Sequence, residues 1–214
     1  MKVESLTYEA VQVSGVLVDC DSLPVTNGYV QISAGQNTVI FQVDPVSGLF
    51  EGSFLACDSS GFTLIGVDEN TLLQSEELSF PPDSVVDAGQ IPTCDVELAE
   101  FVKGKMDGVD FLYTNYVSVS DSIPGAGFIL YAQGNDQSEK VALVTSANGP
   151  GAFPAIEFGF GFGNYALDPE NITVTVTEFG LVAGDLVRGT FEGAYMDAFG
   201  NSHFVSGEFK AVRD

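Results

Sequence analysis

The sequence contains few of the residues on which catalysis and nucleic-acid binding depend. Its 214 residues include one histidine, no tryptophan and 7 basic residues against 30 acidic ones, which gives a formal net charge of −23. Nucleic-acid-binding proteins contact phosphates through clustered Lys and Arg, so this charge excludes nucleic acid as a partner. Anionic membrane surfaces would also repel the chain. We expect no transmembrane segment, because no apolar run reaches about 18 residues, and no secretory signal peptide directly after Met1.

Catalytic and zinc sites have few candidate residues. A Ser-His-Asp triad would have to use His203, but no G-x-S-x-G motif supplies the serine, so we interpret His203 as a half-exposed strand residue. Zinc requires several His and Cys ligands at short spacing, and the three cysteines are far apart with no C-x-x-C. Carboxylate pairs arise by chance among 30 acidic residues, so they do not identify a hydrolase. We predict a protein that is not an enzyme.

Calcium is the one cofactor that the acidic residues could bind, since it takes oxygen ligands. None of the candidates follows the EF-hand spacing, and an aspartate that bonds its own backbone in a turn explains each of them more simply. We therefore predict no cofactor, with weak calcium candidates at Asp19, Asp21, Asp136, Glu139 and Asp197.

What the sequence does contain indicates an all-β protein. It has 24 glycines and 17 phenylalanines, and 45% of its residues are hydrophobic, which favours strands joined by tight turns around a sizeable core. Period-2 alternation leaves no room for a helix longer than about three turns. The length fits two modules, for which we predict the boundaries 1–95 and 96–214, with a hinge at 95–99.

Seven short strands at regular spacing predict an antiparallel sandwich in the first module. Turn residues separate them, as in D-S-L-P at 21–24 and D-P-V-S-G at 44–48. The expected strands are 11–19, 28–33, 38–43, 49–55, 62–67, 74–80 and 85–91.

Several motifs of this module resemble the carboxypeptidase regulatory-like domain. They are V-S-G-V-L-V-D at 13–19, P-V at 24–25, N-G-Y-V at 27–30, S-G-L-F at 47–50 and D-A-G-Q-I at 87–91. The resemblance covers about 85 residues and implies a transthyretin-like, seven-stranded sandwich without catalytic activity. In that fold the first and last strands run parallel and side by side, so the resemblance pairs Cys20 with Cys94 in a disulfide. Cys57 is then free, or replaces one partner if the strand order differs.

The second module is predicted to be another antiparallel sandwich or a barrel. Its expected strands are 111–119, 127–132, 140–145, 155–162, 172–179, 186–195 and 203–212. The ending G-T-F-E-G at 189–193, D-A-F-G-N at 197–201 and G-E-F-K-A-V-R at 207–213 resembles uncharacterised surface lipoprotein domains of Bacteroidetes-type bacteria. That resemblance implies an outer-surface location and brings no established activity.

An unusual run of alternating phenylalanine and glycine occupies 158–163. In a strand, Phe158, Phe160 and Phe162 share one face and the glycines share the other. We predict a core strand with mostly buried rings, because three exposed aromatics in a row would favour aggregation. The alternative is an aromatic platform, extended by Tyr165, that stacks on a sugar or on another chain.

Together these features predict a non-catalytic structural or adhesive module of the extracellular space or outer cell surface. Its partner would be a protein, a second copy of the chain or a glycan. A carbohydrate-binding module of a surface glycan-utilisation system is the first alternative, and a hydrolase with paired carboxylates is the second.

Overall fold

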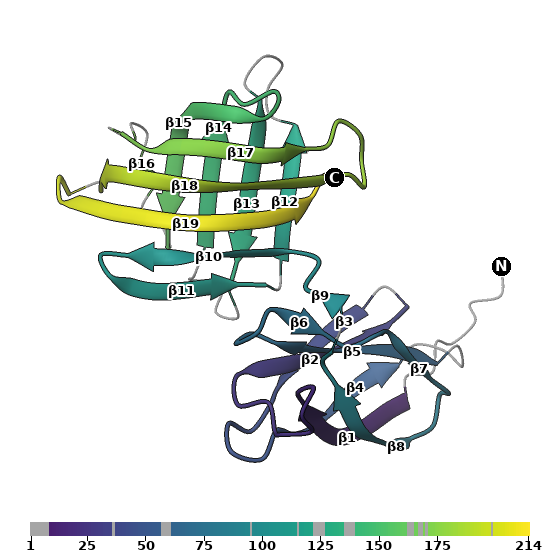
Figure 1. Ribbon diagram of the computed structural model, residues 1–214. Helices are drawn as coiled ribbons and strands as arrows, with labels where there is room; N and C mark the ends of the chain where they lie inside the picture. Colours follow the sequence, from purple (N-terminus) through teal and green to yellow (C-terminus); the bar gives the residue numbers. More distant parts are fainter. Residues whose placement is uncertain are drawn as a thin grey trace, which may run out of the picture. The chain divides into compact units, whose positions relative to one another are not determined.

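The computed structural model consists of strands and turns that form two compact units, Met1–Leu98 and Ala99–Asp214 (Figure 1). It describes residues 9–35, 37–56, 61–94, 96–114, 116–121, 127–134, 140–161, 165–166, 169, 171–197 and 199–214. Within these residues the chain is all-β and has no helix. None of them therefore forms a helix long and apolar enough to cross a membrane.

The first unit is a sandwich of two sheets. One sheet has the order β4-β1-β8, and the other has the order β3-β2-β5-β6-β9 with β7 paired to β5. The strands are β1 (Glu9–Val18), β2 (Gly28–Ala34), β3 (Asn37–Gln42), β4 (Leu49–Ala56), β5 (Phe62–Asp68), β6 (Leu73–Gln74), β7 (Leu78–Phe80), β8 (Val85–Pro92) and β9 (Val96–Glu97).

Alternating apolar side chains build the core between these sheets. On β4, Phe50 and Phe54 are buried while Glu51 and Ser53 face solvent, as expected of a half-buried strand. β1 runs antiparallel to β4 and parallel to β8, which confirms the predicted adjacency of the first and last long strands. The core also includes Leu17, Ile32, Leu64 and Ile91, all fully buried.

The boundary of the first unit differs from the predicted one. The predicted hinge at 95–99 overlaps β9, which pairs with β6, and the amide of Leu98 bonds to the carbonyl of Leu72. These hydrogen bonds attach residues 96–98 to the first unit, because a paired strand cannot also be a free linker. The predicted strand 74–80 is two strands, β6 and β7, which pair with different parts of β5.

The second unit is one ten-stranded antiparallel sheet that curls into a nearly closed barrel. Its order is β11-β10-β19-β18-β17-β15-β14-β13-β12, with β16 paired to β15. The strands are β10 (Phe101–Met106), β11 (Val109–Tyr113), β12 (Tyr116–Asp121), β13 (Phe128–Gln133), β14 (Lys140–Thr145), β15 (Gly151–Phe160), β16 (Tyr165–Ala166), β17 (Thr173–Phe179), β18 (Leu186–Met196) and β19 (Ser202–Val212).

A bend in β15 turns the sheet back on itself. Residues 151–154 pair with β17, whereas Ala155 and residues 157–160 pair with β14. The register shift next to Thr145 leaves Ile156 without a partner in the β14 ladder, which is a bulge of the kind that forms barrel corners. As a result, β12, β13 and β14 cross the direction of β17, β18 and β19 (Figure 1). Both sets of strands enclose one apolar core that contains Phe128, Phe191 and Phe209.

The barrel closes where the end of β19 meets β12. Val119 and Arg213 form an isolated parallel bridge, and the amide of Asp214 bonds to the carbonyl of Val119 at 2.9 Å. Glu100 supports this closure, because its carboxylate accepts the amide of Val212. Burial raises the pKa of Glu100 above its ordinary value.

Aromatic rings cover glycines on neighbouring strands in both units. Gly15 lies opposite Phe50, Gly207 opposite Phe191, and Gly189 opposite Phe209 in the strand registers. A Cβ atom added to Gly207 would stand 2.5 Å from Cζ of Phe191 and 2.6 Å from the carbonyl oxygen of Lys103. Each ring therefore occupies the space that a side chain at its glycine would need.

Candidate functional site

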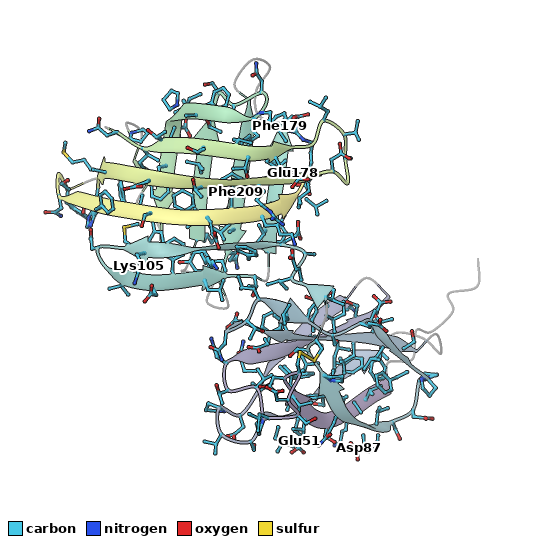
Figure 2. The ribbon with its side chains drawn as sticks, viewed as in Figure 1. Glu51, Asp87, Lys105, Glu178, Phe179 and Phe209 are labelled. Carbon is cyan, nitrogen blue, oxygen red and sulfur yellow. A yellow bond between two sulfur atoms is a disulfide. The ribbon has the colours of Figure 1, made fainter. Side chains whose placement is uncertain are left out.

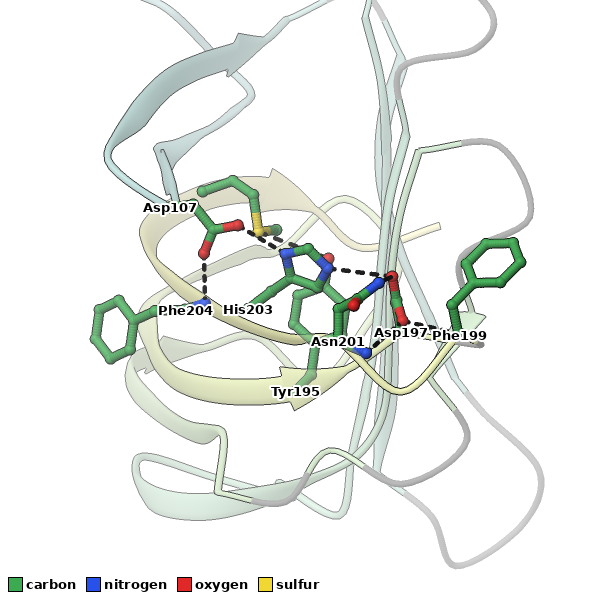
Figure 3. Close-up of polar contacts among 8 residues, drawn as sticks. Asp107, Tyr195, Asp197, Phe199, Asn201, His203 and Phe204 are labelled. Carbon is green, nitrogen blue, oxygen red and sulfur yellow. Dashed lines mark hydrogen bonds and ion pairs between the residues drawn. The ribbon is translucent and has the colours of Figure 1, made fainter.

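The second unit carries a polar cluster at one end of its barrel, here called the barrel tip. The barrel tip comprises residues 106–109, at the turn between β10 and β11, and residues 196–197 and 199–204, at the end of the β18–β19 hairpin. The two segments are joined because β10 pairs with β19 as far as Met106 and Val205. Figure 3 shows the cluster, with His203 at its centre.

Both ring nitrogens of His203 contact carboxylates. Nδ1 lies 2.6 Å from Oδ2 of Asp107, and Nε2 lies 3.3 Å from Oδ2 of Asp197. Asp107 is 96 residues away in the sequence and also accepts the amide of Phe204 at 2.8 Å. The pair of bonds from Asp107 fixes the start of β19 against the β10–β11 turn.

Asp197 organises the hairpin turn through its own backbone contacts. Its Oδ1 accepts the amides of Phe199 and Asn201, at 2.9 and 2.8 Å, and its Oδ2 accepts the side-chain amide of Asn201. A closed Asx turn of this kind fixes the loop without any ligand. His203 then connects this hydrogen-bonded turn to the β10–β11 turn through Asp107.

Tyr195 is a buried residue that packs against His203. Its ring stacks on His203 with centroids 5.2 Å apart, and its hydroxyl donates to Sδ of Met106 at 3.6 Å. The stacking holds the imidazole plane between the two carboxylates (Figure 3). Burial raises the pKa of the Tyr195 hydroxyl to about 12, so it stays protonated and continues to donate.

The electrostatics of the cluster favour a protonated histidine. The hydrogen bond to Asp107 raises the pKa of His203 above its ordinary value of 6.5, and the contact with Asp197 acts in the same direction. The bond from His203 lowers the pKa of Asp107, and the two bonds from Asn201 lower the pKa of Asp197 to about 2. Both ring nitrogens of His203 contact carboxylates of the protein, so in this arrangement neither nitrogen is directed toward a substrate.

Two phenylalanines extend from the barrel tip into solvent. Phe199 is 85% exposed and Phe204 is 50% exposed, and they lie on opposite sides of the cluster (Figure 3). Val109 and Met196 are also exposed there. Exposed apolar residues are common singly on protein surfaces, but here four of them belong to the two turns of the barrel tip.

The described part of the aromatic run, residues 158–161, belongs to β15 and the turn after it. Phe158 is 1% exposed and packs between Phe191 and Tyr195, so it belongs to the core as predicted and cannot be part of an exposed platform. Phe160 is partly buried against the same core and contacts the ring of Phe111. Phe162 and the side chain of Tyr165 lie outside the described residues.

The calcium candidates do not come together in the part of the chain that the structure describes. Asp19 accepts the amides of Asp21 and Leu23, both at 2.9 Å, and is therefore a turn residue like Asp197. Asp136 and Glu139 lie outside the described residues. Among the described residues no group of three or more His, Cys, Asp or Glu is arranged to hold a metal ion.

Cys20 and Cys94 form a disulfide, the pair that the sequence analysis expected (Figure 2). Their Cα atoms are 5.2 Å apart, at the adjacent ends of β1 and β8. Thr93 supports this end, because its amide and its hydroxyl both donate to the carbonyl of Val18. Cys57 lies outside the described residues.

Sequence reasoning missed the partners of His203. The D-A-F-G-N turn was identified, but Asp107 was not connected with it because the contact spans 96 residues. A usable signal was present: Asp107 precedes Gly108, and a D-G pair is typical of a tight hairpin turn, although no turn was predicted there.

Comparison of the chain with protein-family models, with curated proteins and with solved structures gives no match.

Proposed function

We propose that this chain is a non-catalytic structural or adhesive module of an extracellular or cell-surface protein, and that it contacts its partner through the barrel tip. The observation that carries the proposal is the exposure of Phe199 and Phe204 on a hairpin that the Asp107–His203–Asp197 contacts connect to the β10–β11 turn. Aromatic side chains are enriched at protein interfaces, where they fill pockets of the partner.

Rigidity gives these rings an advantage in binding. Ordering a loop or a side chain on association opposes binding, and a turn that is already fixed avoids most of that cost. The backbone of Phe199 is fixed by its bond to Asp197, and that of Phe204 by its bond to Asp107. The barrel tip is therefore organised before the partner arrives.

Charge indicates the chemistry of the partner. The chain has a net charge of −23, and the carboxylates of Asp107 and Asp197 lie between the two exposed rings. A protein surface that combines basic side chains with an apolar pocket complements this patch. A second copy of the same chain would meet it with like charge, which opposes self-association.

The disulfide supports a location outside the cytoplasm. Structural disulfides form and persist in oxidising compartments and are rare in the reducing cytoplasm. The Cys20–Cys94 bond joins the ends of two paired strands of the first unit, and such a position is typical of a structural disulfide. The resemblance of the first module to carboxypeptidase regulatory-like domains supports the same proposal.

A peptide-display selection on the intact chain tests the proposal. We expect the selected peptides to combine Lys or Arg with large apolar residues, and their affinity to fall at least about tenfold in the Phe199→Ala/Phe204→Ala variant, because aromatic anchors dominate interfaces. The matched control is Leu23→Ala/Val46→Ala, which removes two exposed apolar residues of the first unit and should bind like the wild type.

A glycan array with the same three proteins separates the carbohydrate-binding alternative. Glycan binding that depends on Phe199 and Phe204, without peptide binding, would favour that alternative over a protein partner. Peptide binding that is equal in the wild type and the double-Phe variant would refute the role of the barrel tip.

A further inference from the structure

Arg213 lies at the point where the barrel closes, and its backbone is fixed on both sides. Its amide donates to the carbonyl of Asp185 and its carbonyl accepts the amide of Gly184, both at 2.9 Å. Together with the bridge to Val119, these bonds attach the end of β19 to β12 and to the loop between β17 and β18. The position of the side chain is therefore determined by the barrel and not by a mobile tail.

The side chain of Arg213 is 5% exposed, yet its hydrogen bonding is incomplete. Nη1 pairs with the carboxylate of Asp121, and Cζ lies 4.8 Å from the ring centroid of Phe179. Nε and Nη2 are buried and have no hydrogen-bond partner among the residues that the structure describes. Buried polar groups in folded proteins are almost always bonded, and an unbonded charged donor is especially unfavourable.

The two unbonded nitrogens form one recognition edge. In a planar guanidinium, the Nε–H and the N–H of Nη2 that faces it are parallel, so this edge can donate two hydrogen bonds to the two oxygens of one carboxylate. The ion pair with Asp121 uses the other side of the group. The side chain of Asp121 is 77% exposed, so the ion pair on the Nη1 side of the guanidinium lies at the surface, whereas the Nε/Nη2 edge is covered by the barrel.

The surroundings favour a singly charged ligand that has an apolar part. One guanidinium already shares its charge with Asp121 in a chain of net charge −23, so a doubly charged phosphate would be poorly neutralised. The loop that is bonded to the backbone of Arg213 exposes Leu181 and Val182, and Asp185 fixes this loop by accepting both of their amides. Figure 2 shows Phe179 in the same region, directly before this loop.

We propose that the Nε/Nη2 edge of Arg213 binds the carboxylate of an apolar ligand, whose apolar part contacts Leu181 and Val182. The carboxylate could come from a free organic acid or from the C-terminus of a peptide, and both present the same planar pair of oxygens. The site is independent of the barrel tip and would operate whether or not the adhesive function holds.

NMR of the arginine Nε–H groups in the intact chain tests this site directly. The chain has two arginines, Arg188 and Arg213, so Arg188→Lys and Arg213→Lys assign both signals. We expect hexanoate to shift the Arg213 signal in a saturable way, and hexanamide and sodium chloride at equal ionic strength to leave it in place. The Arg188 signal is the internal reference. An N-acetylated Ala-Leu-Val peptide, with a free or an amidated C-terminus, shows whether a peptide carboxylate binds more tightly than the free acid.

Three variants then examine the individual contacts. Arg213→Lys keeps the charge but loses the planar edge, so hexanoate affinity measured by calorimetry should fall at least about tenfold. Asp121→Asn leaves Arg213 intact, removes a competing negative charge and should strengthen binding, which keeps the test valid if Arg213→Lys fails to fold. Leu181→Ala/Val182→Ala should weaken hexanoate but not acetate. The proposal is wrong if hexanoate and hexanamide shift the Arg213 signal equally, or if neither moves it more than the Arg188 signal.

Discussion

Replacing Cys20 and Cys94 by serine removes the covalent link between the ends of β1 and β8 while leaving their hydrogen-bonded ladder in place. Cys20 is exposed and Cys94 half-buried, so serine loses little packing in the folded state. The main effect falls on the unfolded chain, which gains the freedom that the bond had removed. For a sequence separation of 74, the chain-entropy relation gives a loss of about 4.5 kcal/mol in the free energy of unfolding.

The assay must report each unit separately, because the two units can unfold at different denaturant concentrations. Pulsed hydrogen exchange along a urea series, read by mass spectrometry, gives one midpoint from peptides of β1 and β8 and another from peptides of β18 and β19. With an m value of about 1–2 kcal/mol/M for a unit of this size, the midpoint of the first unit should fall by at least about 2 M urea.

The second unit of the same molecule is the internal reference, and its midpoint should not change. Cys57→Ser is the matched control, because it removes the third thiol and retains the bridge; the double variant is best made in that background. A decrease below about 0.5 M, or an equal decrease in both units, would refute the reasoning from loop closure.

Two further predictions concern the second unit. The C2 proton of the single histidine should titrate above pH 6.5 in NMR spectra, and Asp107→Asn should lower that pKa. Because folding raises the pKa of His203, its contribution to stability is complete below pH 6.5 and is lost as pH rises through the folded value. A wild-type pKa at or below 6.5 would contradict the contacts of His203 with Asp107 and Asp197. Gly207→Ala should lower the free energy of unfolding by about 1–3 kcal/mol through overlap with Phe191 and the Lys103 carbonyl, whereas Gly149→Ala, with open space at its Cβ, should be neutral in the same urea titration.

Strand positions could be predicted well wherever alternation and turn residues agreed. β14 has the predicted bounds, and the long hairpin of β18 and β19 was placed within one residue at each of its ends. β10 was missed, because Lys103, Gly104 and Lys105 interrupt its apolar pattern. Gly104 is nevertheless suited to the strand, since its neighbour Gly207 on β19 leaves no room for a larger residue.

The predicted strand 111–119 is wrong for a physical reason. It is two strands, β11 and β12, which pair with β10 and β13 respectively. Tyr113 and Val117 are both buried, so the inward-facing positions keep the same parity across the break and the alternation does not reveal it. Only the weak turn signal near Thr114 marks the corner.

The two polar sites differ in how visible they were. The contact of His203 with Asp107 depends on the pairing of β10 with β19, which no local pattern specifies. Arg213 was visible in principle: it continues the inward series Val205, Gly207, Phe209 on β19, and alternation places its side chain inside the barrel. An arginine at an inward position near the end of an apolar strand therefore predicts a buried charged side chain.

The glycines covered by aromatic rings affect how this sequence can vary. Each pair, such as Gly207 with Phe191, divides one volume between two positions, so neither residue is free to change alone. A larger residue at the glycine requires a smaller one at the ring, and a smaller ring leaves a cavity unless the glycine grows. Mutational drift in this protein should therefore pass through paired exchanges, with single changes at either position as the unstable intermediates. At these positions, the glycine and the phenylalanine are two parts of the same packing arrangement.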